Sequence, residues 1–538
     1  MFRFVSAMKK NAAIIFRSAI LILLGVTIGL YISDDSFFER DVNFSSSGQS
    51  KLSKVLDLVR NKYVDSINVD SVEGETVNEL LQRLDPHSLY LPAQQALSVN
   101  EKLEGGFNGV GIEYNLLRDT LVISYVYPGG PAALQGLKAG DKVIEVDHEK
   151  FAGTELTNAR INKKLRGPKG SNLLLAVIPG NATDVKLVNV KRDRVMLSSI
   201  DAAYKVDGET GYIKISKFAT NTDADFRTAL LKLKDNGVKK LILDLRGNGG
   251  GYLNSATSLA DEFLNSKQLI VYTKGIHEPR TDYFATDSGT YQDGKLAVLI
   301  DEYSASASEI LAGALQDLDR ATIVGRRSFG KGLVQEQFAF KDGSAVNLTV
   351  ARYYTSSGRS IQKTYKNGVV SYRNELAERM RKGELFSAES NLNDSVLHTN
   401  TNYRTSNGRK VFSGGGIMPD VFVPEDTTKN TWLISQLSKR DLFTAYIIDH
   451  MQPALKAYAL DDDFINGYTI SDADFTKFIK YASLTVKDIT TEEVTAGKAH
   501  IKTLLKAHAA HFKWGDAGYY RALNATDVAL KKAVEALN

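Results

Sequence analysis

Residues 295–344 constrain the chain most, because they join a short apolar run, a serine-rich turn, a small-residue helix and Gly330-Lys331-Gly332. The apolar run, residues 296–300, is typical of a strand buried on both faces of a sheet. The turn that follows, residues 301–310, contains three serines and leads into a helix over residues 311–315. A serine at this junction lies beside unpaired helix N–H groups, which can stabilise an oxyanion. The order predicts acyl-bond cleavage by a serine and a lysine.

A structural interpretation of the same turn stays open. Ser306 and Glu309 fit the Ser-x-x-Glu capping box that simply starts a helix. Ser304 and Ser308 are rivals for a nucleophilic role, and local chemistry does not choose among the three serines.

The block from Ser304 to Gln335 resembles the C-terminal processing peptidases, or tail-specific proteases, which are serine peptidases with a Ser-Lys dyad. The matching motifs are the serine-rich turn, an Ala-Gly-Ala-Leu-Gln-Asp helix at residues 312–317, and the Gly-Lys-Gly turn. The resemblance implies Ser306 as nucleophile, Lys331 as general base and Gln335 as the residue that holds the lysine.

Local chemistry agrees with this role for Lys331. A lysine acts as a base near neutral pH only where its ammonium form is disfavoured, for example by desolvation. The flanking glycines and the neighbouring Phe329, Leu333 and Val334 permit a dry pocket. Gln335 is four residues further on, an offset that returns to the same face of a helix or a strand. The alternative is an ordinary turn lysine in solvent.

A second glycine-rich turn predicts one wall of an oxyanion hole. Residues 239–245 read as a buried strand that enters Arg-Gly-Asn-Gly-Gly-Gly at residues 246–251, which also resembles the family. Successive glycines let main-chain N–H groups approach a substrate closely. We expect the amide of Gly249 or Gly250 to act together with the amide of Ala307. A phosphate-binding loop would need a Gly-x-x-x-x-Gly-Lys-Ser/Thr pattern, which is absent here.

Residues 128–133 and 136–146 are similar to PDZ domains. A PDZ domain binds a peptide C-terminus by adding it as a strand to an open sheet edge. The resemblance implies that main-chain N–H groups of Gly109, Val110, Gly111 and Ile112 receive the terminal carboxylate.

Arg166 lies where a helix is expected to end, at Leu165-Arg166-Gly167-Pro168. We hypothesise that Arg166 couples tail binding to the active site by pairing with a group in the protease core.

The expected fold class is α+β and multidomain. A chain of 538 residues with 43% apolar residues can hold three or four domains. We predict a signal anchor or signal peptide, a helical N-terminal domain, a sandwich-like PDZ domain inserted before a mixed α/β protease core, and a helical C-terminal extension. Their predicted ranges are residues 1–34, 35–102, 103–194, 195–424 and 425–538.

The start of the chain predicts export. Arg3, Lys9 and Lys10 precede an apolar stretch over residues 11–32, interrupted by Arg17. This pattern indicates a signal peptide or an uncleaved anchor with its N-terminal end in the cytoplasm. The protein is therefore expected in the periplasm, membrane-anchored or soluble. The C-terminal helices are expected to cap the core, dimerise it or bind an adaptor.

Composition limits the partners. The net charge is only +4, no basic run alternates with aromatics, and cysteine is absent. Nucleic acid, thiolate metal sites and disulfides are therefore not expected, and neither is a cofactor or metal. The expected partners are proteins or peptides with free, apolar C-termini.

Two rival functions remain open. The first is a penicillin-binding-type enzyme, since Ser328 and Lys331, like Ser360 and Lys363, fit Ser-x-x-Lys. The second is a non-catalytic PDZ scaffold.

Overall fold

The computed structural model describes residues 50–180, 182–387 and 402–538. They form two compact units, residues up to 96 with 335–348, and residues 97–334 with 349–538. The predicted anchor at residues 11–32 lies outside the described residues. In the part that is described, no helix combines the length and apolar character needed to span a bilayer.

The smaller unit is helical, with one added sheet segment. Helices α2 (Lys51–Lys62) and α3 (Val69–Gln82) begin at side-chain caps from Ser50 and Asn68. Strand β1 (Leu89–Leu91) pairs antiparallel with the start of β18 (Ala345–Thr355), so that Leu91 lies opposite Ala345. The predicted helical N-terminal region is therefore present, and it includes a hairpin end from much later in the sequence.

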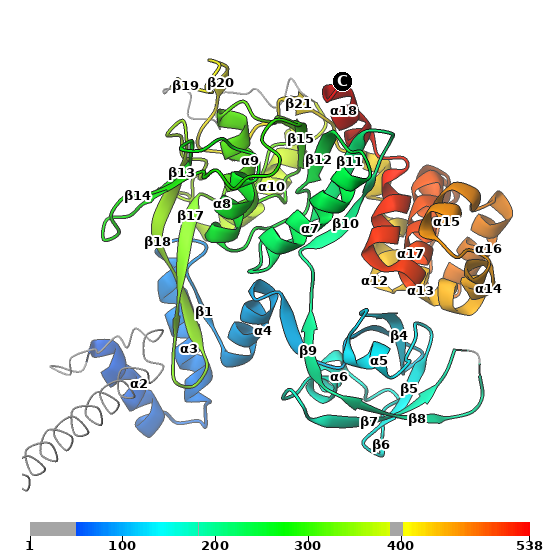
Figure 1. Ribbon diagram of the computed structural model, residues 1–538. Coiled ribbons are helices and arrows are strands. Elements are labelled where there is room, and N and C mark those ends of the chain that lie inside the picture. Colours follow the sequence, from blue (N-terminus) through cyan, green and yellow to red (C-terminus); the bar gives the residue numbers. More distant parts are fainter. Residues whose placement is uncertain (1–49, 181, 388–401) are drawn as a thin grey trace, which may run out of the picture. The chain divides into compact units, whose positions relative to one another are not determined.

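The centre of the larger unit is a six-stranded sheet in the order β10-β11-β12-β15-β16-β21 (Figure 1). The strands from β11 onward are parallel and β10 is antiparallel to β11. Their bounds are β10 Ile200–Lys205, β11 Thr210–Ile215, β12 Lys240–Asp244, β15 Lys295–Ile300, β16 Thr322–Gly325 and β21 Val421–Phe422. The predicted strands at residues 239–245 and 296–300 are confirmed as β12 and β15, which are adjacent.

Both faces of this sheet are covered, which explains the continuous apolar runs. In β15, Val298 packs with α7 (Thr222–Asp235), α8 (Leu253–Asp261) and α9 (Ala307–Asp317). The alternate residues Ala297 and Leu299 pack on the other face against α18 (Val528–Ala536). Side chains of a strand point to opposite faces in turn, so both faces need apolar partners.

The PDZ fold is a separate sheet in the order β3-β4-β5-β7-β8, with β6 beside β5. Two short helices complete it, α5 (Pro131–Leu134) and α6 (Asn158–Leu165). The strands are β3 Ile112–Leu117, β4 Thr120–Val126, β5 Lys142–Val146, β6 Glu149–Lys150, β7 Asn172–Ile178 and β8 Lys186–Lys191. Strand β3 is an edge strand, because β4 is its only partner among the described residues.

Two further pairings accompany the core. Strand β2 (Gly106–Gly109) pairs with β9 (Asp193–Met196), immediately before and after the PDZ fold. The later part of β18 pairs with β13 (Leu269–Lys274), which pairs with β14 (Thr281–Phe284). Strand β17 (Leu333–Ala339) also pairs with β18.

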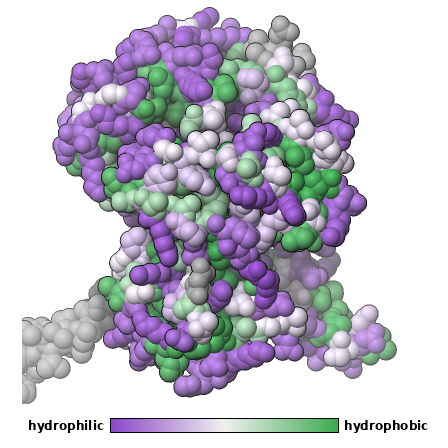
Figure 2. Space-filling view, turned by 90° about the vertical axis from the view of Figure 1, so that its right-hand side faces the viewer, coloured by the Kyte–Doolittle hydropathy of each residue, from purple (hydrophilic) through white to green (hydrophobic). Residues whose placement is uncertain are grey.

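The C-terminal extension is helical, as predicted, and has its own hydrophobic core. Its elements are α12 Trp432–Lys439, α13 Leu442–Tyr446, the π-helix η2 Ile447–Met451, α14 Gln452–Lys456, α15 Asp461–Gly467, α16 Asp472–Ala482, α17 Thr491–Asn524 and α18. The face in Figure 2 is largely hydrophilic, with hydrophobic residues in small groups, in keeping with 24% charged residues.

The last helix of the chain should contribute to the stability of the protease core. Leu530 in α18 is 5% exposed and belongs to the cluster against the core sheet, whereas Val528 in the same helix is 49% exposed. We expect Leu530→Ala to lower the free energy of unfolding by about 2–4 kcal/mol, because it leaves a cavity under the sheet.

The measurement is denaturant unfolding of the full chain, followed by tryptophan fluorescence and circular dichroism. Val528→Ala is the matched control and should change the free energy of unfolding by about 0.5 kcal/mol or less. Equal effects of the two substitutions would contradict the role of α18.

Candidate active site

Two turns leave the same edge of the core sheet. Strands β12 and β15 are parallel neighbours, with Asp244 opposite Leu299, so the residues after each strand emerge side by side. The Asn248 carbonyl accepts hydrogen bonds from the Ala305 N–H at 3.0 Å and the Ser308 hydroxyl at 2.9 Å. The glycine-rich turn and the serine-rich turn are therefore joined directly.

Two of the three candidate serines have structural roles. The Ser304 hydroxyl is fully buried and donates to the Leu245 carbonyl at 2.9 Å. The Ser308 hydroxyl is also fully buried and is held by Asn248. Ser306 is half-buried at the start of α9, so it is the serine that a substrate can reach.

Ser306 has a strained backbone, with φ of 56° and ψ of −114°. Such conformations are rare for residues with a side chain and cluster at functional sites. The Glu309 N–H donates to the Ser306 carbonyl at 2.8 Å, and the Glu309 carboxylate accepts the Ser306 N–H at 2.9 Å. Backbone groups and Glu309 thus satisfy the start of α9.

Lys331 lies in an irregular segment immediately before β17. Gly330 has φ of +89°, and a Cβ there would lie 3.1 Å from the Cβ of Lys363. The Gly330 carbonyl accepts the Lys363 N–H at 3.0 Å, and the Gly332 N–H donates to the Gln362 side chain at 2.8 Å. Residues 326–332 are not helical, which argues against a Ser-x-x-Lys helix of the penicillin-binding type.

Two residues that the sequence analysis did not assign to the active site join the turns of Ser306 and Lys331. One oxygen of the Glu309 carboxylate accepts the N–H groups of both Ser306, at 2.9 Å, and Lys331, at 2.8 Å. The Tyr353 hydroxyl lies 3.2 Å from the Ser306 carbonyl and 2.8 Å from the Lys331 carbonyl. Glu309 appeared only as a possible capping residue, and nothing in the sequence distinguishes Tyr353 within β18.

The predicted oxyanion hole needs one revision. The Gly250 N–H donates to the Asn248 side chain at 2.9 Å, so this amide is already engaged. The amides of Gly249 and Ala307 donate to no other group in the described part of the chain. Gly250 instead packs against the serine turn, since a Cβ there would lie 2.8 Å from the Ser306 Cβ. Gly249 and Ala307 remain the candidate donors.

Gln335 lies in β17, half-buried, and falls within the smaller unit. Its support of Lys331 stays a prediction. Asp317, the last residue of α9, forms a fully buried ion pair with Arg359 at 2.7 Å and accepts the Ser357 hydroxyl at 2.6 Å. These contacts give Asp317 a structural role.

The PDZ groove lies where the sequence predicts it, except that Gly109 pairs with Asp193 of β9, forms a bridge with Arg166 and does not line the cavity. A cavity of about 360 Å³ lies between residues 110–114 and the end of α6, where Asn162 and Leu165 line it. Gly111 has φ of +80°, and the carbonyls of Val110 and Gly111 accept the N–H groups of Ala132 and Tyr127. The loop is thus held by its carbonyls beside an open strand edge, which suits an added peptide strand.

Arg166 lines the same cavity at the C-cap of α6. Its guanidinium forms an ion pair with Glu101, in α4 (Ala93–Leu103), and lies 4.8 Å from the ring centroid of Phe107. The expected partner from the protease core is replaced by Glu101, because α6 ends beside α4 and β2. The coupling role of Arg166 stays a prediction.

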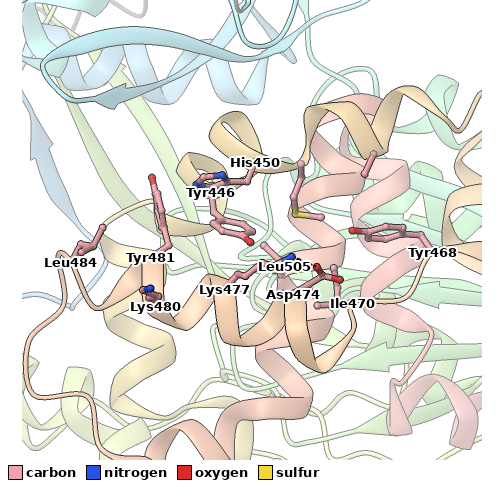
Figure 3. Close-up of a pocket in the computed structure, with 12 residues that line it drawn as sticks. Tyr446, His450, Tyr468, Ile470, Asp474, Lys477, Lys480, Tyr481, Leu484 and Leu505 are labelled. Carbon is pink, nitrogen blue, oxygen red and sulfur yellow. Dashed lines mark ion pairs between the residues drawn. The ribbon is translucent and has the colours of Figure 1, made fainter.

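Another cavity, of about 480 Å³, lies among the C-terminal helices (Figure 3). Tyr446, Tyr468 and Tyr481 line it together with apolar side chains, and Lys477 and Lys480 lie at its edge. None of the predicted catalytic residues lines this cavity.

The described site consists of a strained serine, a lysine turn and a glycine-rich wall at one edge of a parallel sheet, beside a PDZ fold. These features define a PDZ-containing serine peptidase. Residues 209–371 match peptidase family S41, residues 97–178 match the PDZ domain, and residues 433–515 match a family of unknown function, DUF8443.

Curated relatives of the chain are named as carboxy-terminal processing proteases. The chain is 35% identical over 318 residues to the carboxy-terminal-processing protease of Bartonella bacilliformis, covering 58% of this chain and 72% of that protein. It is 34% identical over 318 residues to the carboxy-terminal processing protease CtpB of Bacillus subtilis, covering 58% and 65%. Among solved structures, the chain is 25% identical to the photosystem II D1 C-terminal processing protease, with a TM-score of 0.35 and coverage of 70% of this chain and 87% of that one. The chain belongs to peptidase family S41 and is a C-terminal processing protease.

The close approach of Gly250 to Ser306 should be essential for activity. Gly247 and Gly250 both have positive φ, of 71° and 103°. A Cβ at Gly247 meets nothing within 4 Å, whereas one at Gly250 lies 2.8 Å from both the Ala305 carbonyl oxygen and the Ser306 Cβ. Gly250→Ala should therefore displace the serine turn and lower kcat about 100-fold.

The matched control is Gly247→Ala, which carries similar backbone strain without the clash and should retain kcat within about threefold. Peptide cleavage at saturating substrate measures both variants, and circular dichroism monitors folding. Comparable kcat values for the two variants would contradict the requirement that Gly250 approach Ser306 closely.

Proposed function

We propose that this protein is a serine endopeptidase in which Ser306 is the nucleophile and Lys331 the general base, and that its PDZ domain holds the C-terminus of the substrate. The observation that carries the proposal is the pairing of the two turns. Glu309 and Tyr353 each hydrogen-bond to the backbone of both Ser306 and Lys331, although Ser306 and Lys331 are 25 positions apart in the sequence.

The chemistry follows from these roles. The Ser306 hydroxyl attacks the peptide carbonyl carbon as its proton passes to the neutral Lys331 amine. The oxyanion that forms accepts hydrogen bonds from the amides of Gly249 and Ala307. When the C–N bond breaks, the Lys331 ammonium gives its proton to the leaving amine, and an acyl-enzyme remains. Water then attacks the ester, Lys331 takes the water proton and returns it to Ser306, and the acid product leaves.

The PDZ domain supplies recognition in this proposal. Amides of residues 109–112 would receive the terminal carboxylate, and the free edge of β3 would pair with the last residues of the tail. The adjoining cavity is lined by charged residues such as Glu101 and Arg166 as well as by Val110, Ile112 and Leu165, and these three apolar residues favour an apolar side chain near the terminus.

The apolar segment at residues 11–32 supports export, so the proposed substrates are exported proteins that are trimmed or degraded outside the cytoplasm. We further propose that this protease itself lies in the periplasm, either anchored to the membrane or soluble. We propose that the C-terminal helices other than α17 and α18 bind a second copy or an adaptor, since α17 and α18 already contact the core sheet.

The dyad makes a direct prediction about digestion of an unstructured protein such as casein. Ser306→Ala and Lys331→Ala should each reduce cleavage by about 1,000-fold or more, because each removes one half of the proton transfer. Ser308→Ala is the control: it removes one buried hydrogen bond, costs about 1 kcal/mol of stability, and should keep most of the activity. Normal cleavage by either dyad variant would refute the mechanism.

The PDZ role predicts a preference for a free carboxylate. A peptide with an apolar free C-terminus should be cleaved with at least about tenfold higher kcat/KM than its C-terminally amidated form, because amidation removes the charge that the loop amides receive. A penicillin-binding-type enzyme would ignore the difference, and a scaffold would bind the free form without cutting it. Equal cleavage of both peptides would contradict C-terminal recognition.

A further inference from the structure

Glu309 and Tyr353 contact opposite sides of the two turns that carry the proposed dyad. Glu309, in the first turn of α9, accepts the N–H groups of Ser306 and Lys331, while the Tyr353 hydroxyl from β18 is shared by their two carbonyls. We propose that Glu309 and Tyr353 are positioning residues that set the distance between the Ser306 hydroxyl and the Lys331 amine. This inference rests on the proposed dyad.

The geometry restricts the spacing directly. The nitrogens of Ser306 and Lys331 lie 2.9 and 2.8 Å from the same oxygen of Glu309. Two donors on one acceptor cannot lie more than about 6 Å apart. Tyr353 applies a second restraint through the carbonyls, so each turn is held by both its N–H and its C=O.

Helix capping alone does not account for Glu309. A capping glutamate needs only the Ser306 N–H, yet three further donors come from the lysine turn. Its second oxygen accepts the Ser328 hydroxyl at 2.5 Å and the Gly330 N–H at 2.7 Å. The side chain is fully buried, and its donors are divided between the serine turn and the lysine turn.

The contacts of Glu309 and Tyr353 hold Ser306 in its strained backbone conformation. A positive φ at a residue with a side chain, here with ψ of −114°, costs about 1–3 kcal/mol and persists only where the surroundings fix it. Glu309 holds the N–H of that residue and Tyr353 its carbonyl, so both peptide groups of Ser306 are restrained. Loss of either contact lets the turn relax and moves the hydroxyl away from the lysine.

The charged form of Glu309 suits these contacts. Burial outweighs the lowering effect of the four donors and raises the pKa of this carboxyl to about 7. Tyr353 is also fully buried, and burial followed by the nearby Glu309 charge raises the pKa of its phenol far above the ordinary value. Tyr353 therefore stays a neutral donor, and above about pH 7 the ionised carboxylate offers acceptors to all four groups.

Two conservative variants test the proposal. Glu309→Gln keeps the shape but leaves one carbonyl oxygen where two carboxylate oxygens stood, so it can serve only one pair of donors. Tyr353→Phe removes only the hydroxyl. We expect kcat to fall about 10- to 100-fold in each variant, with KM changed by less than about twofold, because the dyad and not substrate binding is disturbed.

A merely structural role would not move the acid limb of the kcat/KM–pH profile, which reports the groups that must lose a proton, here Lys331 and Glu309 itself. Tyr353→Phe keeps the Glu309 carboxyl, so a shift in that variant reports the placement of the lysine. We expect this limb to move by at least about half a pH unit in both variants. Glu262→Gln and Tyr212→Phe are the matched controls: Glu262 is a buried carboxylate held by Arg227, and the buried Tyr212 hydroxyl donates to Asp244. The controls should keep the profile of the unmodified protein.

The outcomes separate the two proposals. Normal kcat and an unchanged profile in Glu309→Gln and Tyr353→Phe, with Ser306→Ala inactive, would overturn the positioning role and leave the dyad intact. A loss of activity that only matches the unfolded fraction, measured by circular dichroism, would also overturn it. Activity in Ser306→Ala would overturn the dyad, and the positioning role with it.

Discussion

Parallel pairing of β12 with β15 is the constraint on which the active site depends. Because Asp244 lies opposite Leu299, the chain leaves both strands at the same edge, and the glycine turn and serine turn meet there. Neither turn could form an oxyanion site alone. The wall needs the N–H groups of the first helical turn, and the serine needs a backbone close enough that only a glycine fits beside it.

This strand pairing requires that both faces of the sheet be covered by apolar side chains. Helices that follow the strands cover one face, as in any right-handed crossover. The other face is covered by α18, more than two hundred residues beyond β15. The C-terminal extension is thus partly a component of the protease core, because Ala297 and Leu299 of β15 would otherwise face water. The remaining C-terminal helices have their own hydrophobic core and do not depend on this contact.

Local patterns predict the elements well, and the reason is physical. The continuous apolar run that lets β15 be buried on both faces, and the glycine and proline that follow α6, act within a few residues and are visible in the sequence. The roles of Glu309 and Tyr353 are not visible, because they depend on a hydrogen-bond acceptor and a donor meeting turns that are far apart in the chain. Gly250 was misjudged for a similar reason: its N–H direction depends on the Asn248 side chain. Arg166 was expected to reach the core, but the nearer carboxylate of Glu101 satisfies it.

The two recognition elements of the proposed function differ in what they can read. An edge strand such as β3 offers the same backbone groups to every peptide, so it supplies affinity with little dependence on sequence. A loop of amides reads only the presence of a terminal carboxylate, which every protein carries. Selectivity must then come from the cavity beside Ile112 and Leu165, and from whether a tail is unstructured enough to add as a strand. A protease built this way selects accessible tails more than particular sequences, which makes the placement of Ser306 and Lys331, and not peptide binding, the step that must be restrained most closely.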